Sequence, residues 1–205
     1  GDVVKSCDTN SFRTIEPVTL YAIWHVNEYT VVFNANNGSD TTIEQKLTFE
    51  EEKTLLPNTF ERTGYSFVGW STTTTGRVEY TDEQAVKGLL STNNDTLNLY
   101  AVWQANTYKI IFDANTGEGN MEELTLSYDS EKMLPINNYV KEGYTFIKWN
   151  TKLDGSGESY ENNQTIKNLL TSGSLTLYAQ WLEHTYTVVF NSNDGTNTTI
   201  EQVFA

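Results

Sequence analysis

Acidic side chains are the residues of this chain most able to do acid–base chemistry, and they cluster at Glu50-Glu51-Glu52 and Glu122-Glu123. Paired carboxylates can serve as general acid and base when their surroundings separate their pKa values. The two clusters do not occupy matching positions in the repeats described below, and no histidine or nucleophile accompanies them in the pattern. We therefore predict solvated carboxylates at both places and a protein that is not an enzyme.

Polar turns that contain glycine raise the question of calcium binding. An EF-hand loop needs an oxygen ligand at position 1, glycine at position 6 and glutamate at position 12. With Gly195 at position 6, Glu201 falls at position 12, but position 1 is Phe190, and Phe33 and Phe112 take that place in the other copies. The pattern predicts ordinary hairpin turns, with no metal site and no cofactor.

One cysteine, Cys7, and two histidines, His25 and His184, complete the reactive side chains. A single cysteine cannot form an internal disulfide, and no Cys/His cluster has zinc-ligand spacing. We expect Cys7 to be a buried, inert thiol and the histidines to lie in surface linkers, with a pH-sensitive junction as the alternative. Four Asn-x-Ser/Thr sequons matter only in a eukaryotic secretory host; they begin at Asn37, Asn94, Asn163 and Asn197.

Tryptophans could stack on sugars if their rings were exposed. Trp103 and Trp181 end apolar strands, which predicts that they pack in the core. Trp70 and Trp149 fall on the opposite strand face from the neighbouring tyrosines. They are therefore the candidate binding residues of the chain, for a ligand that the sequence does not identify.

The elements that position these residues form a tandem repeat. Trp24, Trp103 and Trp181 lie 79 and 78 residues apart, and Trp70 and Trp149 lie 79 apart. Self-similarity at a fixed period is typical of repeat architectures. We predict complete copies at 28–106 and 107–184.

The two ends of the chain resemble parts of the same repeat. Residues 1–27 look like the tail half of a preceding copy, and residues 185–205 look like the head half of a following one. The sequence thus predicts a stretch of a longer array. Because the two halves are complementary, they could complete each other head-to-tail between molecules.

Within one repeat, alternating apolar and polar residues predict strands. The expected strands are 29–34, 43–49, 65–70 and 97–103, with equivalents in the second copy. A short helix is expected after the third strand, because Thr81 and Gln84 have capping-box spacing and apolar residues follow at helical intervals. Those residues are Val86, Leu89 and Leu90, repeated as Ile166, Leu169 and Leu170. The predicted fold class is α+β, mostly β with one short helix per repeat.

The charge and composition of the chain exclude some classes of binding partner. The chain has 205 residues with 27 acidic and 13 basic side chains, for a formal charge of −14. Such a surface repels phosphate backbones, so we predict no nucleic-acid partner. No stretch approaches 18 consecutive apolar residues, and no basic segment precedes an apolar run, so neither membrane insertion nor a signal peptide is predicted for this stretch.

Three recurring motifs are similar to a known family: residues 29–34 followed by Asn-Gly, residues 64–70, and Leu99-Tyr100-Ala101-Val102-Trp103. Together they resemble the Listeria–Bacteroides repeat, also called the internalin B-type B repeat, over essentially the whole chain. The resemblance implies tandem β-grasp (ubiquitin-like) domains on secreted, cell-surface proteins of bacteria, with no catalytic residues to carry over. Lys148 in place of Gly69, and a copy slightly longer than usual, depart from that pattern.

The combined prediction is an extracellular stalk or spacer of a bacterial adhesin-like protein, located at the cell surface or cell wall. Its expected partners are neighbouring repeats of the same protein. The alternatives are a direct binding module for a host surface protein or glycan, and a filament segment that self-associates head-to-tail. A binder should repeat an exposed patch at the 79-residue period, whereas a spacer should let its exposed faces differ between copies.

Overall fold

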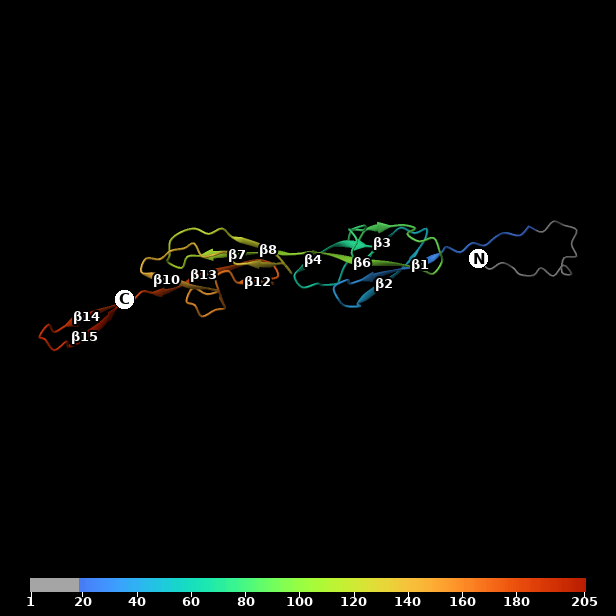
Figure 1. The fold of residues 1–205 in the computed structure, drawn as a ribbon. Helices are drawn as coiled ribbons and strands as arrows, with labels where there is room; N and C mark the ends of the chain where they lie inside the picture. The colour runs from blue at the N-terminus through green and yellow to red at the C-terminus, as the bar shows by residue number, and fades with distance from the viewer. Residues whose placement is uncertain (1–18) are drawn as a thin grey trace, which may run out of the picture. The chain divides into compact units, whose positions relative to one another are not determined.

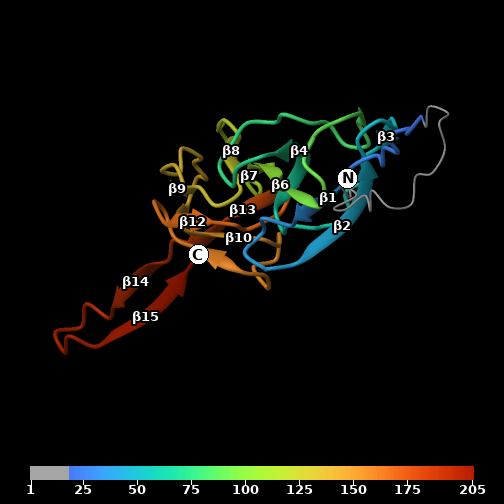
Figure 2. The same cartoon turned by 90° about the vertical axis from the view of Figure 1, so that its right-hand side faces the viewer.

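The computed structural model describes residues 19–205, and these form two compact units built from β-strands (Figures 1 and 2). Unit 1 comprises the described residues up to Glu61 together with Phe67–Trp103. Unit 2 comprises Arg62–Ser66 and Gln104–Ala205. The repeat boundaries expected at 28–106 and 107–184 stay a prediction. Cys7 lies outside the described residues.

Unit 1 is built around a four-stranded mixed sheet with the order β2-β1-β6-β4. Strand β1 runs antiparallel to β2 and parallel to β6, with Phe33 opposite Ile43 on one side and Leu99 on the other. A second, two-stranded sheet pairs β3 with β5. The strands are β1 (Glu28–Asn34), β2 (Thr42–Thr48), β3 (Lys53–Thr54), β4 (Tyr65–Ser71), β5 (Ala85–Val86) and β6 (Asp95–Ala105).

Unit 2 repeats this arrangement in a five-stranded sheet with the order β11-β10-β13-β7-β8. Two further pairs, β9 with β12 and β14 with β15, form separate sheets. The strands are β7 (Thr107–Asp113), β8 (Leu124–Ser127), β9 (Glu131–Met133), β10 (Tyr144–Asn150), β11 (Ser159–Tyr160), β12 (Thr165–Lys167), β13 (Gly173–Glu183), β14 (Tyr186–Asn191) and β15 (Thr199–Phe204).

Equivalent residues fill the two cores because the inward face of each strand keeps the same side-chain types. In unit 1 the first strand buries every second residue, and the last strand contributes a leucine and an alanine. The matching core residues are Tyr29 and Tyr108, Phe33 and Phe112, Leu55 and Leu134, Trp70 and Trp149, Leu99 and Leu177, and Ala101 and Ala179. The predicted half-buried strands are therefore confirmed.

The predicted helix is wrong, and with it the α+β, β-grasp-like fold class. No helix occurs among residues 19–205, and so none of these residues forms a helix long and apolar enough to cross a membrane. Where a helix was expected, Ala85–Val86 pairs with β3 and Thr165–Lys167 pairs with β9. The described chain is all-β, with several small mixed sheets in two repeat domains.

Left-handed backbone at two points explains why no helix forms. Glu83 and Gly88 have φ values of 51° and 62°, which a right-handed helix cannot contain. The capping contact predicted by the sequence does form, since the Thr81 backbone N–H donates to Gln84 Oε1 at 2.9 Å. It closes a turn that leads into β5, and the apolar residues after it pack on the core from an irregular segment.

Candidate functional site

Trp70 and Trp149, the candidate binding residues, lie at the centres of the two cores. Trp70 is 1% exposed and Trp149 is fully buried. Each indole ring is surrounded by three aromatic rings with centroids 4.9–6.1 Å away, from Phe33, Phe60 and Phe67 in unit 1. In unit 2 the same places are taken by Phe112, Tyr139 and Phe146. Neither ring presents a face to solvent on which a sugar could stack.

The indole N–H groups of these two residues share an unusual feature. Neither Trp70 Nε1 nor Trp149 Nε1 has a hydrogen-bond partner within the described chain. A buried donor without a partner is normally costly. The surrounding aromatic rings pack against each indole at steep angles, and this apolar packing is what the buried tryptophan contributes to the core.

Trp103 and Trp181 pack as the sequence predicts, and each has a second role. Their rings are half-buried against Phe67 and Phe146. Trp103 Nε1 donates to the Ala35 carbonyl at 2.8 Å, and Trp181 Nε1 donates to the Ala114 carbonyl at 2.9 Å. Each bond ties the last strand of a repeat to the end of the first.

The asparagine turns are structural in both complete repeats. Asn36 and Asn115 have φ values of 47° and 46°, a conformation that asparagine tolerates better than most residues. Their side-chain amides donate to the carbonyls of Ala101 and Ala179 at 2.9 and 2.8 Å. No group of three His, Cys, Asp or Glu side chains suited to a metal ion occurs in the described chain.

The acidic clusters face solvent and basic side chains. Glu51 lies 2.7 Å from Lys53, and Glu123 pairs with Lys109. The hydrogen bond from Lys53 lowers the pKa of Glu51. A general acid at neutral pH needs the opposite shift, a raised carboxyl pKa. The lowered pKa of Glu51 is therefore the opposite of what a general acid needs.

Unit 2 contains a polar cluster around Asp129 that the sequence analysis missed. The Tyr65 hydroxyl donates to Asp129 Oδ2 at 2.7 Å, and Asn168 Nδ2 donates to Asp129 Oδ1 at 2.8 Å. The Arg62 guanidinium lies 3.9 Å from the centre of the Tyr65 ring. Gly64, with φ +76°, packs so closely that an added Cβ would lie 2.3 Å from the Tyr128 ring.

The hydrogen bonds of this cluster shift the pKa values of Asp129 and Tyr65 in opposite directions. The Asn168 amide, and after it the Tyr65 hydroxyl, lower the pKa of Asp129 by donating to the charged carboxylate. The hydrogen bond to Asp129 raises the pKa of Tyr65. A related set recurs where Lys141 Nζ lies 4.0 Å from the Tyr144 ring and the Tyr144 hydroxyl donates to Glu183. The sequence could have indicated both sets, because the basic residue and the tyrosine recur 79 residues apart, as Arg62 and Lys141 and as Tyr65 and Tyr144.

The histidines lie in exposed segments, as expected. His25 belongs to the described stretch 19–27, which contains no strand. His184 follows β13, and its Nε2 lies 2.8 Å from the Thr145 hydroxyl. Its backbone N–H donates to the Gly143 carbonyl at 2.7 Å, which fixes the chain where it enters β14.

These features define a small all-β repeat protein with a tryptophan-centred core in each copy. The Listeria-Bacteroides repeat domain matches residues 29–102 and 108–180, so the chain belongs to this repeat family. Tandem repeats of this kind are typical of bacterial surface proteins such as internalins. The resemblance noted in the sequence is thereby confirmed.

Three relatives share the repeats. A "Putative membrane protein" of Evansella cellulosilytica is 34% identical over 186 residues, which cover 87% of this chain and 26% of the relative. A "Putative Gly-rich membrane protein" of the same organism is 41% identical over 140 residues, 65% of this chain and 16% of the relative. Internalin H of Listeria monocytogenes is 27% identical over 173 residues, 82% of this chain and 26% of the relative. The chain thus spans about a quarter or less of each.

Proposed function

We propose that the two repeats act as an extracellular spacer in a bacterial surface protein, holding another part of that protein away from the cell wall. One observation carries the proposal: the cores repeat closely, while the charged and polar residues of the outward faces differ between the copies. Phe33 and Trp70 recur as Phe112 and Trp149 in equivalent core positions. A surface that served one ligand in both copies would be expected to repeat as well.

Several outward positions of the sheets change in chemical type between the copies, whereas Val32 and Ile111, and Tyr100 and Tyr178, keep theirs. On the first strand, Thr30 is replaced by Lys109 and Asn34 by Asp113. On the last strand, Val102 is replaced by Gln180. A spacer needs only a soluble surface at these positions, and the acidic charge of the chain meets that need.

The test displays residues 1–205 on a Gram-positive cell, between an epitope tag and a wall anchor. A spacer should show reduced antibody access to the tag when residues 107–184 are deleted. The matched control replaces outward residues of the second repeat by those of the first, Lys109→Thr, Asp113→Asn and Gln180→Val, and should leave access unchanged. A purified chain that binds host cells or glycans, and loses binding in the control variant, would contradict the spacer role and favour a binding module.

A further inference from the structure

A polar pocket lies in unit 1 beside the loop that joins β1 to β2. Its volume is about 360 Å³, and it is lined by residues of the stretch 34–41, by Thr74 and by Tyr100 of β6. Sites for small molecules usually measure roughly 300–1,000 Å³. The pocket therefore has room for one small ligand.

A hydrogen bond and two left-handed residues hold the backbone of this loop in shape. The Ala35 N–H donates to the Thr41 carbonyl at 3.0 Å, which closes the loop. Asn36 and Gly38 have φ values of 47° and 95°, conformations that asparagine and glycine adopt more readily than other residues. A Cβ added at Gly38 would meet no atom within 4 Å, so the loop has open space on that side.

Two asparagine side chains of the pocket are fixed by the main chain around them. Asn36 Nδ2 donates to the carbonyls of Thr74 and Ala101, both at 2.9 Å. Asn34 Nδ2 donates to the Leu99 carbonyl at 3.2 Å. Within residues 19–205 neither Oδ1 atom accepts a hydrogen bond, so each amide keeps an oriented acceptor for a ligand.

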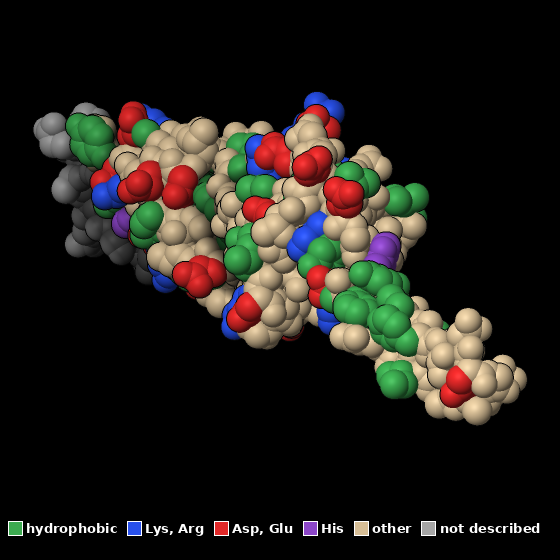
Figure 3. All heavy atoms as spheres, turned by 90° about the vertical axis from the view of Figure 1, so that its left-hand side faces the viewer, with side chains coloured by type: hydrophobic (Ala, Val, Ile, Leu, Met, Phe, Trp, Pro, Cys, Tyr) green, Lys and Arg blue, Asp and Glu red, His purple; other side chains and the backbone are tan. Residues whose placement is uncertain are grey.

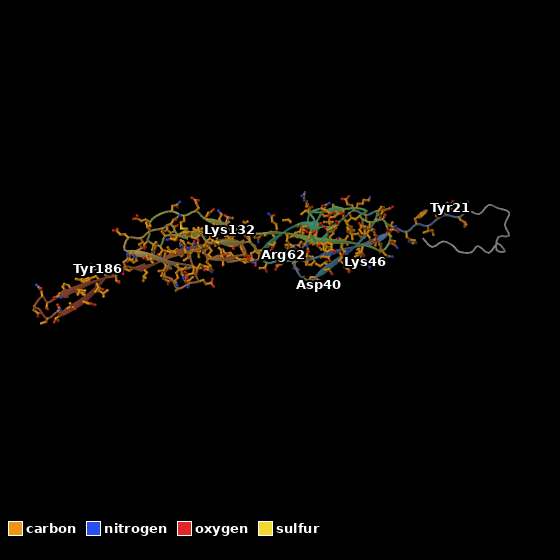
Figure 4. The ribbon with its side chains drawn as sticks, viewed as in Figure 1. Tyr21, Asp40, Lys46, Arg62, Lys132 and Tyr186 are labelled. Atoms are coloured by element: carbon orange, nitrogen blue, oxygen red, sulfur yellow. The ribbon has the colours of Figure 1, made fainter. Side chains whose placement is uncertain are left out.

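A carboxylate, a hydroxyl and an aromatic ring complete the lining. Asp40, labelled in Figure 4, is exposed and forms no ion pair within the described chain. Thr74 contributes a hydroxyl, and Tyr100 contributes a half-buried ring with a polar end. Fixed acceptors beside an aromatic ring suit a ligand that has adjacent hydroxyl groups and an apolar C–H face, which is the chemistry of a sugar.

The charge of the pocket excludes acidic ligands. Among the described residues that line the pocket, Asp40 alone carries a charge. The chain has a formal charge of −14, and Figure 3 shows acidic side chains scattered over the face that it draws. A phosphate or a carboxylated sugar would therefore be repelled, whereas a neutral sugar would not.

We propose that this pocket binds a neutral pyranose, the terminal sugar of a glycan. The Asp40 carboxylate and Asn36 Oδ1 accept hydrogen bonds from neighbouring sugar hydroxyls, and the Tyr100 ring packs against the C–H face of the sugar. Such a site adds a ligand to the spacer and does not depend on the spacer role.

The second repeat lacks half of this set. Its tyrosine is kept as Tyr178, but Gly119 and Leu153 stand where the first repeat has Asp40 and Thr74. The carboxylate and the threonine hydroxyl are thus both absent from the equivalent positions. The site belongs to the first repeat alone, and the second repeat supplies a comparison within the same chain.

The test is an NMR titration of the ¹⁵N-labelled 205-residue chain with the methyl glycosides of glucose, galactose, mannose and N-acetylglucosamine. At least one of them should cause saturable shifts at the backbone amides of residues 36–41 and 74. Half-saturation is expected on the order of 1 mM, as for other ligands of this size. Asp40→Asn and Tyr100→Ala should each weaken binding at least about tenfold, the effect of one hydrogen bond to a charged group.

Matched controls alter the same residue types outside the pocket. Glu50→Gln, at an exposed position of unit 1, and Tyr178→Ala, in the second repeat, should bind like the unchanged chain. The dispersion of each variant's amide spectrum checks that it folds. The proposal is overturned if no glycoside gives saturable shifts, if the shifts lie outside the pocket, or if Asp40→Asn binds unchanged. Methyl glucuronide that binds as tightly as the neutral glycosides overturns it as well.

Discussion

Trp149 shows how much of a repeat depends on one side chain. It is fully buried, touches three aromatic rings and makes no hydrogen bond through its indole within the described chain. Its contribution must therefore come from apolar burial and ring packing. Trp24 is 87% exposed, so its indole contributes neither apolar burial nor ring packing, and it serves as a comparison within the same chain.

Replacing Trp149 by alanine should therefore destabilise unit 2 strongly. The lost burial and the remaining cavity predict a fall of about 3–5 kcal/mol in the free energy of unfolding. Trp24→Ala should change it by no more than about 0.5 kcal/mol. Denaturant unfolding followed by circular dichroism compares the two. Equal effects would contradict the tryptophan-centred core.

The Tyr65–Asp129 hydrogen bond predicts pH effects of opposite sign at its two ends. Asp129 has a lowered pKa in the folded state, so its stabilising contribution is present above the unfolded pKa and is lost as pH falls through the folded pKa. Tyr65 has a raised pKa, so its contribution is present below the unfolded pKa and is lost as pH rises through the folded one. The bond is intact between these limits.

Asp129→Asn should return the Tyr65 pKa toward its usual range, since its principal cause is the hydrogen bond to that carboxylate. An NMR titration of the tyrosine ring carbons measures this directly. Asp40→Asn, an exposed acidic residue of unit 1, is the control and should leave Tyr65 unchanged. A Tyr65 pKa that stays raised in Asp129→Asn would show that another group holds it.

At the scale of the elements, strands could be predicted from the sequence and the helix could not. Alternation identified β1 and β7 because one face of each is buried and the other is not. The helical spacing of Val86, Leu89 and Leu90 arose from a two-residue strand followed by an irregular segment on the core. In the second copy, where Ile166, Leu169 and Leu170 repeat that spacing, Asn163 and Asn168 have φ values of 60° and 52° and form turns in place of a helix.

The candidate site was harder to predict for a physical reason. Strand alternation places Trp70 on one face, but it does not say which segments cover that face. Phe33, from the first strand, and Phe60, from the connector before β4, both pack against it. The Asp129 cluster was equally hidden, because its members come from segments 39–64 residues apart.

Gly88→Ala separates the observed turn from the expected helix by the sign of its effect. In a helix, alanine would raise the free energy of unfolding by about 1 kcal/mol relative to glycine. In the structure Gly88 has φ +62°, and an added Cβ would lie 3.3 Å from the Phe49 ring. We therefore expect the free energy of unfolding to fall by about 1–2 kcal/mol. Thermal and denaturant unfolding measure the change. Lys87→Ala, at an exposed neighbouring position, serves as the control and should be nearly neutral.

At the scale of the whole molecule, the formal charge of −14 governs how copies of the chain meet. Like charges repel over about 30 Å at 0.01 M salt, but over only about 10 Å at 0.1 M. Ionic strength should therefore decide how closely two copies approach.

We accordingly expect the repulsion between copies of the chain to weaken as salt rises from about 0.01 to 0.1 M, because screening shortens its range. The second virial coefficient, measured by static light scattering at several salt concentrations, should be positive at low salt and fall as salt is added. A coefficient that rises with salt would contradict this and indicate attraction between opposite charges.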